Sequence, residues 1–354
     1  MSKAAREPFL HRWGRRVLTI PAFFLGGTFY LALLPLTLTF TAVLDLLRPF
    51  AGTFSRSRAV LMFALYVVCE VVGIAVALAI GVAMLGGRLG GEARYVAANA
   101  ALQRFWTDAL FFGSLRIFGM RVAIEGDALA PSGPLLFFVR HTSVADTVLI
   151  AALIANPARR LLLYVLKREL LWDPCLDLVG LRLPNVFVAR DGKRGEAEIR
   201  AVAGLAALLT PSRAVLLYPE GTRFSEAKRL RAAASLRERG HADLASQADR
   251  MRYVLPPKLG GSLALVDAAP EVDVVFVAHT GFEGAASLAS FWGGALVGKT
   301  IRVRLERVPA AAIPSDNRDA WLFQRWLELD AWVASQLALA TGSGGARAAK
   351  GPVR

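Results

Sequence analysis

The chain has 354 residues, of which 55% are hydrophobic, and it carries a formal net charge of +14. This composition is too apolar for an ordinary soluble protein and indicates membrane segments. The excess of lysine and arginine suits an anionic lipid surface. Because zinc-finger spacing and RNA-binding aromatic motifs are missing from the sequence, we expect no nucleic-acid partner. The two cysteines, Cys69 and Cys175, cannot form a disulfide framework, which predicts reduced thiols and a cytosolic working domain.

The first 88 residues predict a basic N-terminus followed by a membrane segment. Residues 1–16 are rich in lysine and arginine, which favours the cytoplasmic side of a membrane. Residues 17–88 contain two apolar runs, 17–47 and 59–86. The charge-free start of the first run would be about 40 Å long as a helix, against about 30 Å of hydrocarbon core. Because prolines and glycines interrupt it, the run is predicted either to span the membrane with a kink or to form a re-entrant hairpin.

Two spans would return the chain to the cytoplasmic side after Leu85. This topology predicts an integral membrane protein with its working domain in the cytoplasm, located in the inner membrane if the cell is bacterial. Glu70 is the one charged residue between Ala59 and Leu85. An acidic group within a membrane is costly and can be functional, but nothing nearby suggests ion transport. We therefore interpret Glu70 as a structural contact, with Arg58 or another polar group near the interface as its partner.

Residues 100–340 alternate between apolar strands and helical stretches, which predicts an α/β domain with a mostly parallel sheet flanked by helices. Within it, residues 225–252 read as a helical insertion and 316–340 as an amphipathic C-terminal helix. The tail, residues 341–354, is basic and predicted to be disordered. The other predicted helices are Val144 to Ala155 and Glu196 to Leu209. The predicted strands are 135–139, 161–165, 186–188, 214–218, 272–278 and 301–305.

His141 and Asp146 are the first candidates for chemistry, since they follow the strand that ends at Val139. Five residues across a strand-to-helix turn allow a carboxylate to fold back onto an imidazole. There it would fix the tautomer and stabilise the imidazolium that forms when the other ring nitrogen takes a proton. The arrangement follows the logic of a catalytic triad in which a substrate hydroxyl replaces serine. Taken alone, this spacing also occurs by chance.

Two further segments follow strands and are expected at the same edge of the sheet, where open α/β sheets bind ligands. Tyr218 is followed by Pro219, Glu220, Gly221, Thr222 and Arg223. Arg223 can bind phosphate in a bidentate way, and Gly221 lets the backbone approach a ligand closely. Arg190 ends the strand that contains Phe187 and adds a cation. Each segment alone is equally compatible with a solvated surface turn.

Together these segments resemble the 1-acylglycerol-3-phosphate acyltransferase, or lysophospholipid acyltransferase, family. Four blocks occur in the family's order: His141 to Asp146, Phe187 to Arg190, Pro219 to Arg223, and Val254 to Gly260. The extension after Arg223 is similar to the branch that includes lysocardiolipin-type acyltransferases. The sequence departs from the family at Arg140, Lys258 and Gly261, which bears on substrate choice more than on reaction type.

The resemblance implies a glycerolipid acyltransferase fold and a membrane-bound O-acyltransferase. It makes His141 the general base and Asp146 its partner, while Arg190, Glu220, Gly221, Thr222 and Arg223 bind the glycerol phosphate. The acceptor is a lysophospholipid, 1-acylglycerol 3-phosphate first, and the product would be phosphatidic acid. The donor is acyl-CoA or acyl carrier protein, and neither cofactor nor metal is expected.

Other functions remain open: remodelling of another head group, hydrolysis through the same histidine, or lipid binding without catalysis. The remaining histidines, His11, His241 and His279, match no block and are interpreted as non-catalytic.

Overall fold

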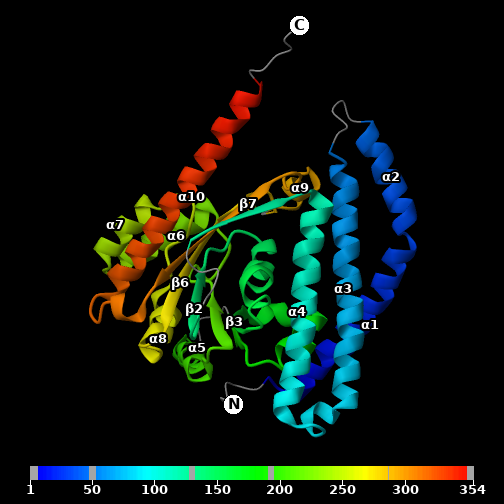
Figure 1. Cartoon of the computed structure of the whole chain (residues 1–354), viewed down its shortest axis with the longest axis horizontal. Helices are drawn as coiled ribbons and strands as arrows, with labels where there is room; N and C mark the ends of the chain where they lie inside the picture. The colour runs from blue at the N-terminus through cyan, green and yellow to red at the C-terminus, as the bar shows by residue number, and fades with distance from the viewer. Residues whose placement is uncertain (1–6, 48–52, 127–131, 190–194, 286, 349–354) are drawn as a thin grey trace.

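The structure, a computed structural model, describes residues 7–47, 53–126, 132–189, 195–285 and 287–348, with side chains to residue 340. It consists of a layer of long N-terminal helices beside an α/β domain built on a seven-stranded sheet (Figure 1).

The sheet has the strand order β1-β7-β6-β2-β5-β3-β4. All neighbouring strands are parallel except the antiparallel pair β6 and β7. This confirms the predicted α/β class with its mostly parallel sheet. The strands are β1 (Arg121–Glu125), β2 (Leu135–Val139), β3 (Leu161–Lys167), β4 (Val186–Val188), β5 (Arg213–Leu217), β6 (Asp273–Thr280) and β7 (Thr300–Val308).

Helices cover both faces of the sheet, which explains why β2 is a continuous apolar run with every residue buried. Leu136 and Phe138 face one core, and Leu135, Phe137 and Val139 face the other. The first core is closed by α5 (Gly195–Ala203), η7 (Gly204–Leu208), α6 (Glu226–Glu238), α7 (Ala242–Arg250), α8 (Leu259–Ala268) and α10 (Arg318–Ala348). The second is closed by α4 (Gly91–Phe118), η3 (Ala145–Val148), η4 (Ala151–Ala155) and the region around α9 (Leu288–Trp292).

Three helices precede α4: α1 (Phe9–Ala32), α2 (Leu34–Leu46) and α3 (Ser55–Ala83). Within the described ranges, α3 is the one helix that is long and apolar enough by itself to cross a membrane. The pair α1 and α2 passes the same test when taken together, with a bend of 55° between the two helices that fits either a broken span or a re-entrant loop. The two predicted apolar runs therefore form helices, and length and composition are what support a membrane role for them.

The helical layer is joined to the α/β domain more closely than the sequence predicted. α4 crosses the expected domain boundary at residue 100 and stands between α3 and the sheet (Figure 1). α3 also contacts the domain directly, because the Arg182 Nη1 atom donates to the Ala77 carbonyl at 2.6 Å and Cys175 packs against Gly73. Near its N-terminus, α3 lies against Gly294. The N-terminal helices and the α/β domain are thus packed as one unit.

Glu70 of α3 is fully buried and accepts a hydrogen bond from Trp106 Nε1 of α4 at 3.1 Å. This contact agrees with a structural interpretation, although the partner is Trp106 and not Arg58. Arg58 donates instead to the carbonyl groups of Thr53 and Ile117.

The C-terminal helix α10 ends at Ala348, beyond the predicted end at residue 340. The composition of residues 341–354, rich in glycine, alanine and basic residues, predicted disorder, but residues 341–348 are helical and 349–354 lie outside the described residues. A helix already nucleated by its packed turns can extend, since each added residue gains a hydrogen bond.

Candidate active site

Two segments of the predicted site meet at the carboxyl edge of the sheet because β2 and β5 are neighbouring parallel strands. Arg140 and His141 follow β2, and the turn that contains Glu220 follows β5. The Phe224 amide donates to the His141 carbonyl at 3.1 Å, which joins the two segments directly. The edge is the position where open α/β sheets bind ligands.

His141 and Asp146 form the predicted pair. His141 Nδ1 lies 3.0 Å from Asp146 Oδ1, with the carboxylate fully buried and the imidazole 13% exposed. Asp146 Oδ2 accepts the amides of Thr142 at 2.6 Å and Ser143 at 2.8 Å, so the loop's own backbone holds the carboxylate in place. Because Nδ1 faces Asp146, Nε2 is the ring nitrogen left for a substrate. The Tyr218 ring lies 4.6 Å from the imidazole ring and limits its movement.

Glu220 makes contacts within the protein. Its carboxylate is buried and accepts the His141 amide at 2.8 Å through Oε1 and the Leu255 amide at 2.9 Å through Oε2. Burial raises the pKa of Glu220 to about 8, while the two amide bonds and nearby Arg140 oppose the rise. Glu220 thus fixes the backbone of His141 to the segment that begins at Val254.

Two exposed cations, Arg223 of the turn and Lys258 of a neighbouring segment, lie at this place. Arg223 is exposed, and Gly221 has a φ of +64°, in the left-handed region that glycine adopts without strain. A Cβ at Gly221 would lie 2.9 Å from Lys258 Cε, so the lysine side chain passes over the glycine. The Lys258 amide also donates to the Pro219 carbonyl at 2.8 Å. Lys258 is therefore a second exposed cation at this turn, one that the sequence had marked only as a departure from the family pattern.

Lys228 of α6 also contacts the turn. Its Nζ donates to the Arg223 carbonyl at 2.9 Å and to Thr222 Oγ1 at 3.2 Å. The Thr222 hydroxyl is thus engaged within the protein. The helical insertion consequently helps to position the Arg223 backbone.

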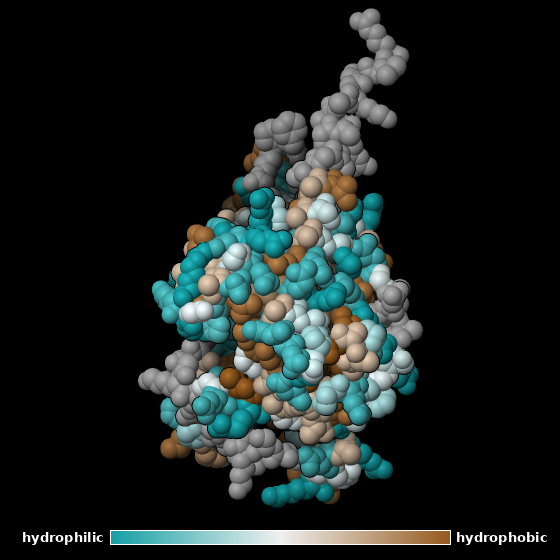
Figure 2. Space-filling model, turned by 90° about the vertical axis from the view of Figure 1, so that its left-hand side faces the viewer, coloured by the Kyte–Doolittle hydropathy of each residue, from teal (hydrophilic) through white to brown (hydrophobic). Residues whose placement is uncertain are grey.

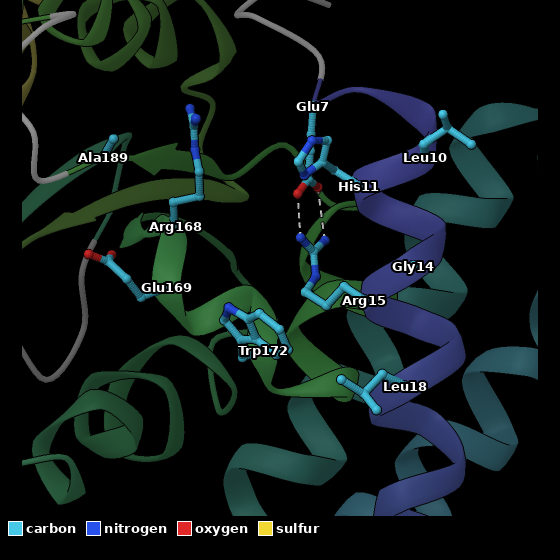
Figure 3. Close-up of a pocket in the computed structure, with 10 residues that line it drawn as sticks. All are labelled: Glu7, Leu10, His11, Gly14, Arg15, Leu18, Arg168, Glu169, Trp172 and Ala189. Atoms are coloured by element: carbon cyan, nitrogen blue, oxygen red, sulfur yellow. Dashed lines mark hydrogen bonds and ion pairs between the residues drawn. The ribbon is translucent and has the colours of Figure 1, made fainter.

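Arg190 lies outside the described residues, so its predicted place at this edge is not described. Its neighbour Ala189 lines a cavity of about 1010 Å³ at the carboxyl ends of β3 and β4. Figure 3 shows α1 on one side of this cavity and Arg168, Glu169 and Trp172 on the other. The remaining lining residues are Glu7, Leu10, His11, Gly14, Arg15 and Leu18 of the N-terminal segment.

Buried titratable groups that the sequence did not assign to the site lie behind the His141 loop. His279, at the end of β6, was interpreted as non-catalytic, yet its Nε2 lies 3.7 Å from Asp146 Oδ2. Arg140 is 2% exposed and forms an ion pair with Glu283 at 2.8 Å. Among the residues that the structure describes, no group of three or more His, Cys, Asp or Glu side chains is placed to hold a metal ion.

Residues 121–277 match the protein-family model described as Acyltransferase. This part of the chain is an acyltransferase domain. The match begins with β1 and reaches into β6, so it includes the His141–Asp146 pair and the Glu220–Arg223 turn. The protein is accordingly an enzyme of the acyltransferase class.

The chain is also similar to the crystal structure of the 1-acyl-sn-glycerophosphate (LPA) acyltransferase, PlsC, from Thermotoga maritima. The TM-score is 0.49 at 14% sequence identity, with 77% of this chain and 97% of that chain covered. No curated protein matches the sequence.

Proposed function

We propose that this protein transfers a fatty acyl group to the free hydroxyl of a lysophospholipid at a membrane surface. The preferred acceptor is 1-acylglycerol 3-phosphate, which would give phosphatidic acid, and the donor is acyl-CoA or acyl carrier protein. The observation that carries this proposal is the His141–Asp146 pair, 3.0 Å apart in an acyltransferase domain and joined by backbone bonds to a turn with exposed cations.

His141 acts as the general base in this proposal. Its Nε2 takes the proton from the acceptor hydroxyl as the oxygen attacks the carbonyl carbon of the donor thioester. A carbon–oxygen bond forms, the carbon–sulfur bond breaks, and the thiolate leaves with the proton returned by the imidazolium. Asp146 holds the ring with Nδ1 toward itself and offsets the positive charge that the ring carries during the step.

The acceptor phosphate is bound by cations at the turn. Arg223 supplies a planar fork of donors, and Lys258, whose side chain passes over Gly221, supplies a point charge. We propose Arg190, which the sequence pattern predicts at the same edge, as a further cation in this group. Glu220 takes no part in phosphate binding and keeps the base and the Lys258 segment in register.

The lipid part of the substrate has a candidate path along α1. The cavity between α1 and η5 (Arg168–Trp172) opens at the same sheet edge as His141 and is lined in part by Leu10, Leu18 and Trp172. The exposed apolar side chains of α1 would lie in the lipid, in a span or in a re-entrant loop, so that a lysophospholipid reaches the site from the membrane.

Two alternatives share this site. A remodelling acyltransferase for another head group, as in the lysocardiolipin-like branch suggested by the extension after Arg223, would use the same base. A hydrolase would deliver water to the thioester instead of a lipid hydroxyl. The intact His141–Asp146 geometry disfavours a lipid-binding protein without catalysis.

The proposal is tested with purified protein in detergent, offered labelled acyl-CoA and a panel of lysophospholipids that differ in head group. Transfer should be fastest to 1-acylglycerol 3-phosphate. Faster transfer to another head group would assign the remodelling function. Label released only as free fatty acid would assign hydrolysis, and binding of anionic lipid without any transfer would leave the non-catalytic interpretation.

A further inference from the structure

His279 occupies a fully buried position behind the candidate catalytic loop. Its Nε2 lies 2.9 Å from the Arg140 carbonyl oxygen, and since a carbonyl can only accept, Nε2 must carry the hydrogen. The other ring nitrogen, Nδ1, is buried and has no hydrogen-bond partner. Burial lowers the pKa of His279, with Asp146 opposing the change and Arg140 adding to it. The ring is therefore a neutral donor aimed at the loop.

The Arg140 side chain in turn contacts the backbone of His279. Its guanidinium donates to the His279 carbonyl at 2.5 Å, to Glu283 Oε1 at 2.8 Å and to the Tyr253 carbonyl at 3.0 Å. Burial alone would raise the pKa of Glu283, but Arg140 and the hydrogen bonds from the Gly281 and Glu283 amides together outweigh this effect, and the pKa lies below its ordinary value. The peptide that precedes His141 is thus held on both sides by β6 and the residues after it.

Asp146 Oδ2 lies 3.7 Å from the same His279 nitrogen, Nε2, too far for a hydrogen bond but close enough for an electrostatic interaction. Asp146 therefore lies between two imidazoles, with His141 at Oδ1 and His279 near Oδ2. The titratable and charged groups that face His279 are Asp146, Arg140 and Glu283. A second imidazolium at this place would compete with His141 for the charge of Asp146, whereas a neutral donor leaves that charge available.

We infer that His279 is a positioning residue for acyl transfer: as a buried neutral donor it fixes the Arg140 peptide, next to the loop whose Asp146 carboxylate orients His141. This inference deepens the proposed function and rests on it. It requires a neutral hydrogen-bond donor at residue 279, not an imidazole as such. The chain offers a way to separate this role from simple packing, because alternate residues of β6 face the opposite core.

The experiment compares three variants. His279→Leu removes the donor and leaves the Arg140 carbonyl unpaired, while His279→Gln keeps an N–H at a similar reach. Phe276→Leu is the matched control, because Phe276 is a buried β6 residue that packs against Trp321 and Trp326, away from the site. For each we would measure thermal stability, kcat, acceptor KM, the pH profile of kcat/KM, and hydrogen exchange of the amides at 141–146.

His279→Leu should lower kcat by about 10- to 100-fold, since a small displacement of a catalytic group has effects of this size, and change acceptor KM little. The acid limb of its pH profile should move to higher pH, because the polar N–H edge 3.7 Å from Asp146 is replaced by an apolar side chain and the carboxylate holds the imidazolium more strongly. Amides 142 and 143 should exchange faster. His279→Gln should restore most of the activity, and Phe276→Leu should change stability alone.

Wild-type kcat and amide protection in His279→Leu would overturn the inference. It would also be overturned if His279→Leu and Phe276→Leu lost activity alike, in step with stability, and both kept the wild-type acid limb. If the wild type transferred no acyl group, the proposed function would fail, while the exchange measurement would still decide whether His279 holds the loop.

Discussion

The α/β domain and the N-terminal helical layer differ in how far their large apolar side chains are exposed. In the domain, the strands bury them between two helical layers, and the face on the side of α6, α7 and α8 is mainly hydrophilic (Figure 2). In the helical layer, large apolar side chains face outward: Leu25 and Val82 are each 74% exposed and Phe29 is 67% exposed. Exposed apolar side chains of this kind fit the proposed lipid contact, whereas the domain carries the polar chemistry.

Buried ion pairs join the helical layer to the α/β domain. Arg15 and Arg16 of α1 both bind Asp177, whose side chain is fully buried in η6 (Leu176–Gly180). Breaking a buried ion pair of this kind leaves a charge without a partner and is strongly destabilising. Helix α1, which the proposed function places in contact with lipid, is consequently held at a fixed place beside the sheet edge that carries His141.

The largest effect on activity is expected for the general base His141, which belongs to the α/β domain alone. His141→Ala should lower turnover by at least ~10²–10⁴, the usual contribution of a positioned general base. Membrane association should be unchanged, because the apolar helices are untouched. Steady-state transfer assays and membrane fractionation check both parts. Near-normal turnover in the variant would remove the proposed mechanism.

The next effect concerns the phosphate cations of the domain. Each charge-assisted bond is worth about 1.5–3 kcal/mol, so Arg223→Ala should raise the acceptor KM by roughly ten- to a hundredfold. Arg223→Lys should be intermediate, because lysine keeps the charge and loses the planar fork. Lys258→Ala should act in the same direction with a smaller effect.

The control is Arg231→Ala, an exposed arginine on α6 whose Nε binds only a carbonyl of its own helix among the contacts described. It should leave both Michaelis constants unchanged. If Arg223→Ala raised the donor KM and left the acceptor KM alone, the turn would bind the donor.

A smaller effect should come from the cavity beside α1. Gly14 lines it, and a Cβ there would have nothing within 4 Å, so Gly14→Leu can place its side chain in open space. We expect a several-fold rise in KM for long-chain acceptors with kcat largely retained. Gly26→Leu is the matched control, since Gly26 lies on the same helix, also has open space, and is not among the lining residues. Equal behaviour of the two variants would show that the lipid does not use this cavity.

The smallest effect is a pH dependence of stability. The pKa of Glu220 is raised from 4.5 to about 8 in the folded protein, so between these values the folded state holds a proton that the unfolded state releases. The contribution of this group to stability is complete below about pH 4.5 and is lost as the pH rises through about 8. Glu220→Gln should therefore lose less thermal stability than the wild type over that range. Parallel curves would contradict the assignment.

The sequence predicted the sheet better than the helical layer for a physical reason. β2, β3, β5 and β6 are apolar runs buried on both faces, so their composition alone marks them. β1 was missed because it is an edge strand whose exposed and half-buried residues alternate.

The contacts of α3 and α4 with the domain depend on packing between distant segments, which no local pattern encodes. Similarly, the His141–Asp146 contact follows from short spacing, whereas the approach of His279 to Asp146 follows from the pairing of β2 with β6. Glu220 matched a motif, yet its burial against two backbone amides could be seen only in three dimensions.

The most direct test of acyl transfer at His141 is a product balance with doubly labelled substrates. Wild-type protein in lipid bilayers would receive acyl-CoA labelled in the acyl chain and 1-acylglycerol 3-phosphate labelled in the glycerol. We predict one phosphatidic acid carrying both labels for each thiol released, and neither product with His141→Ala. Thiol release without doubly labelled lipid, or equal product from both proteins, would contradict the account.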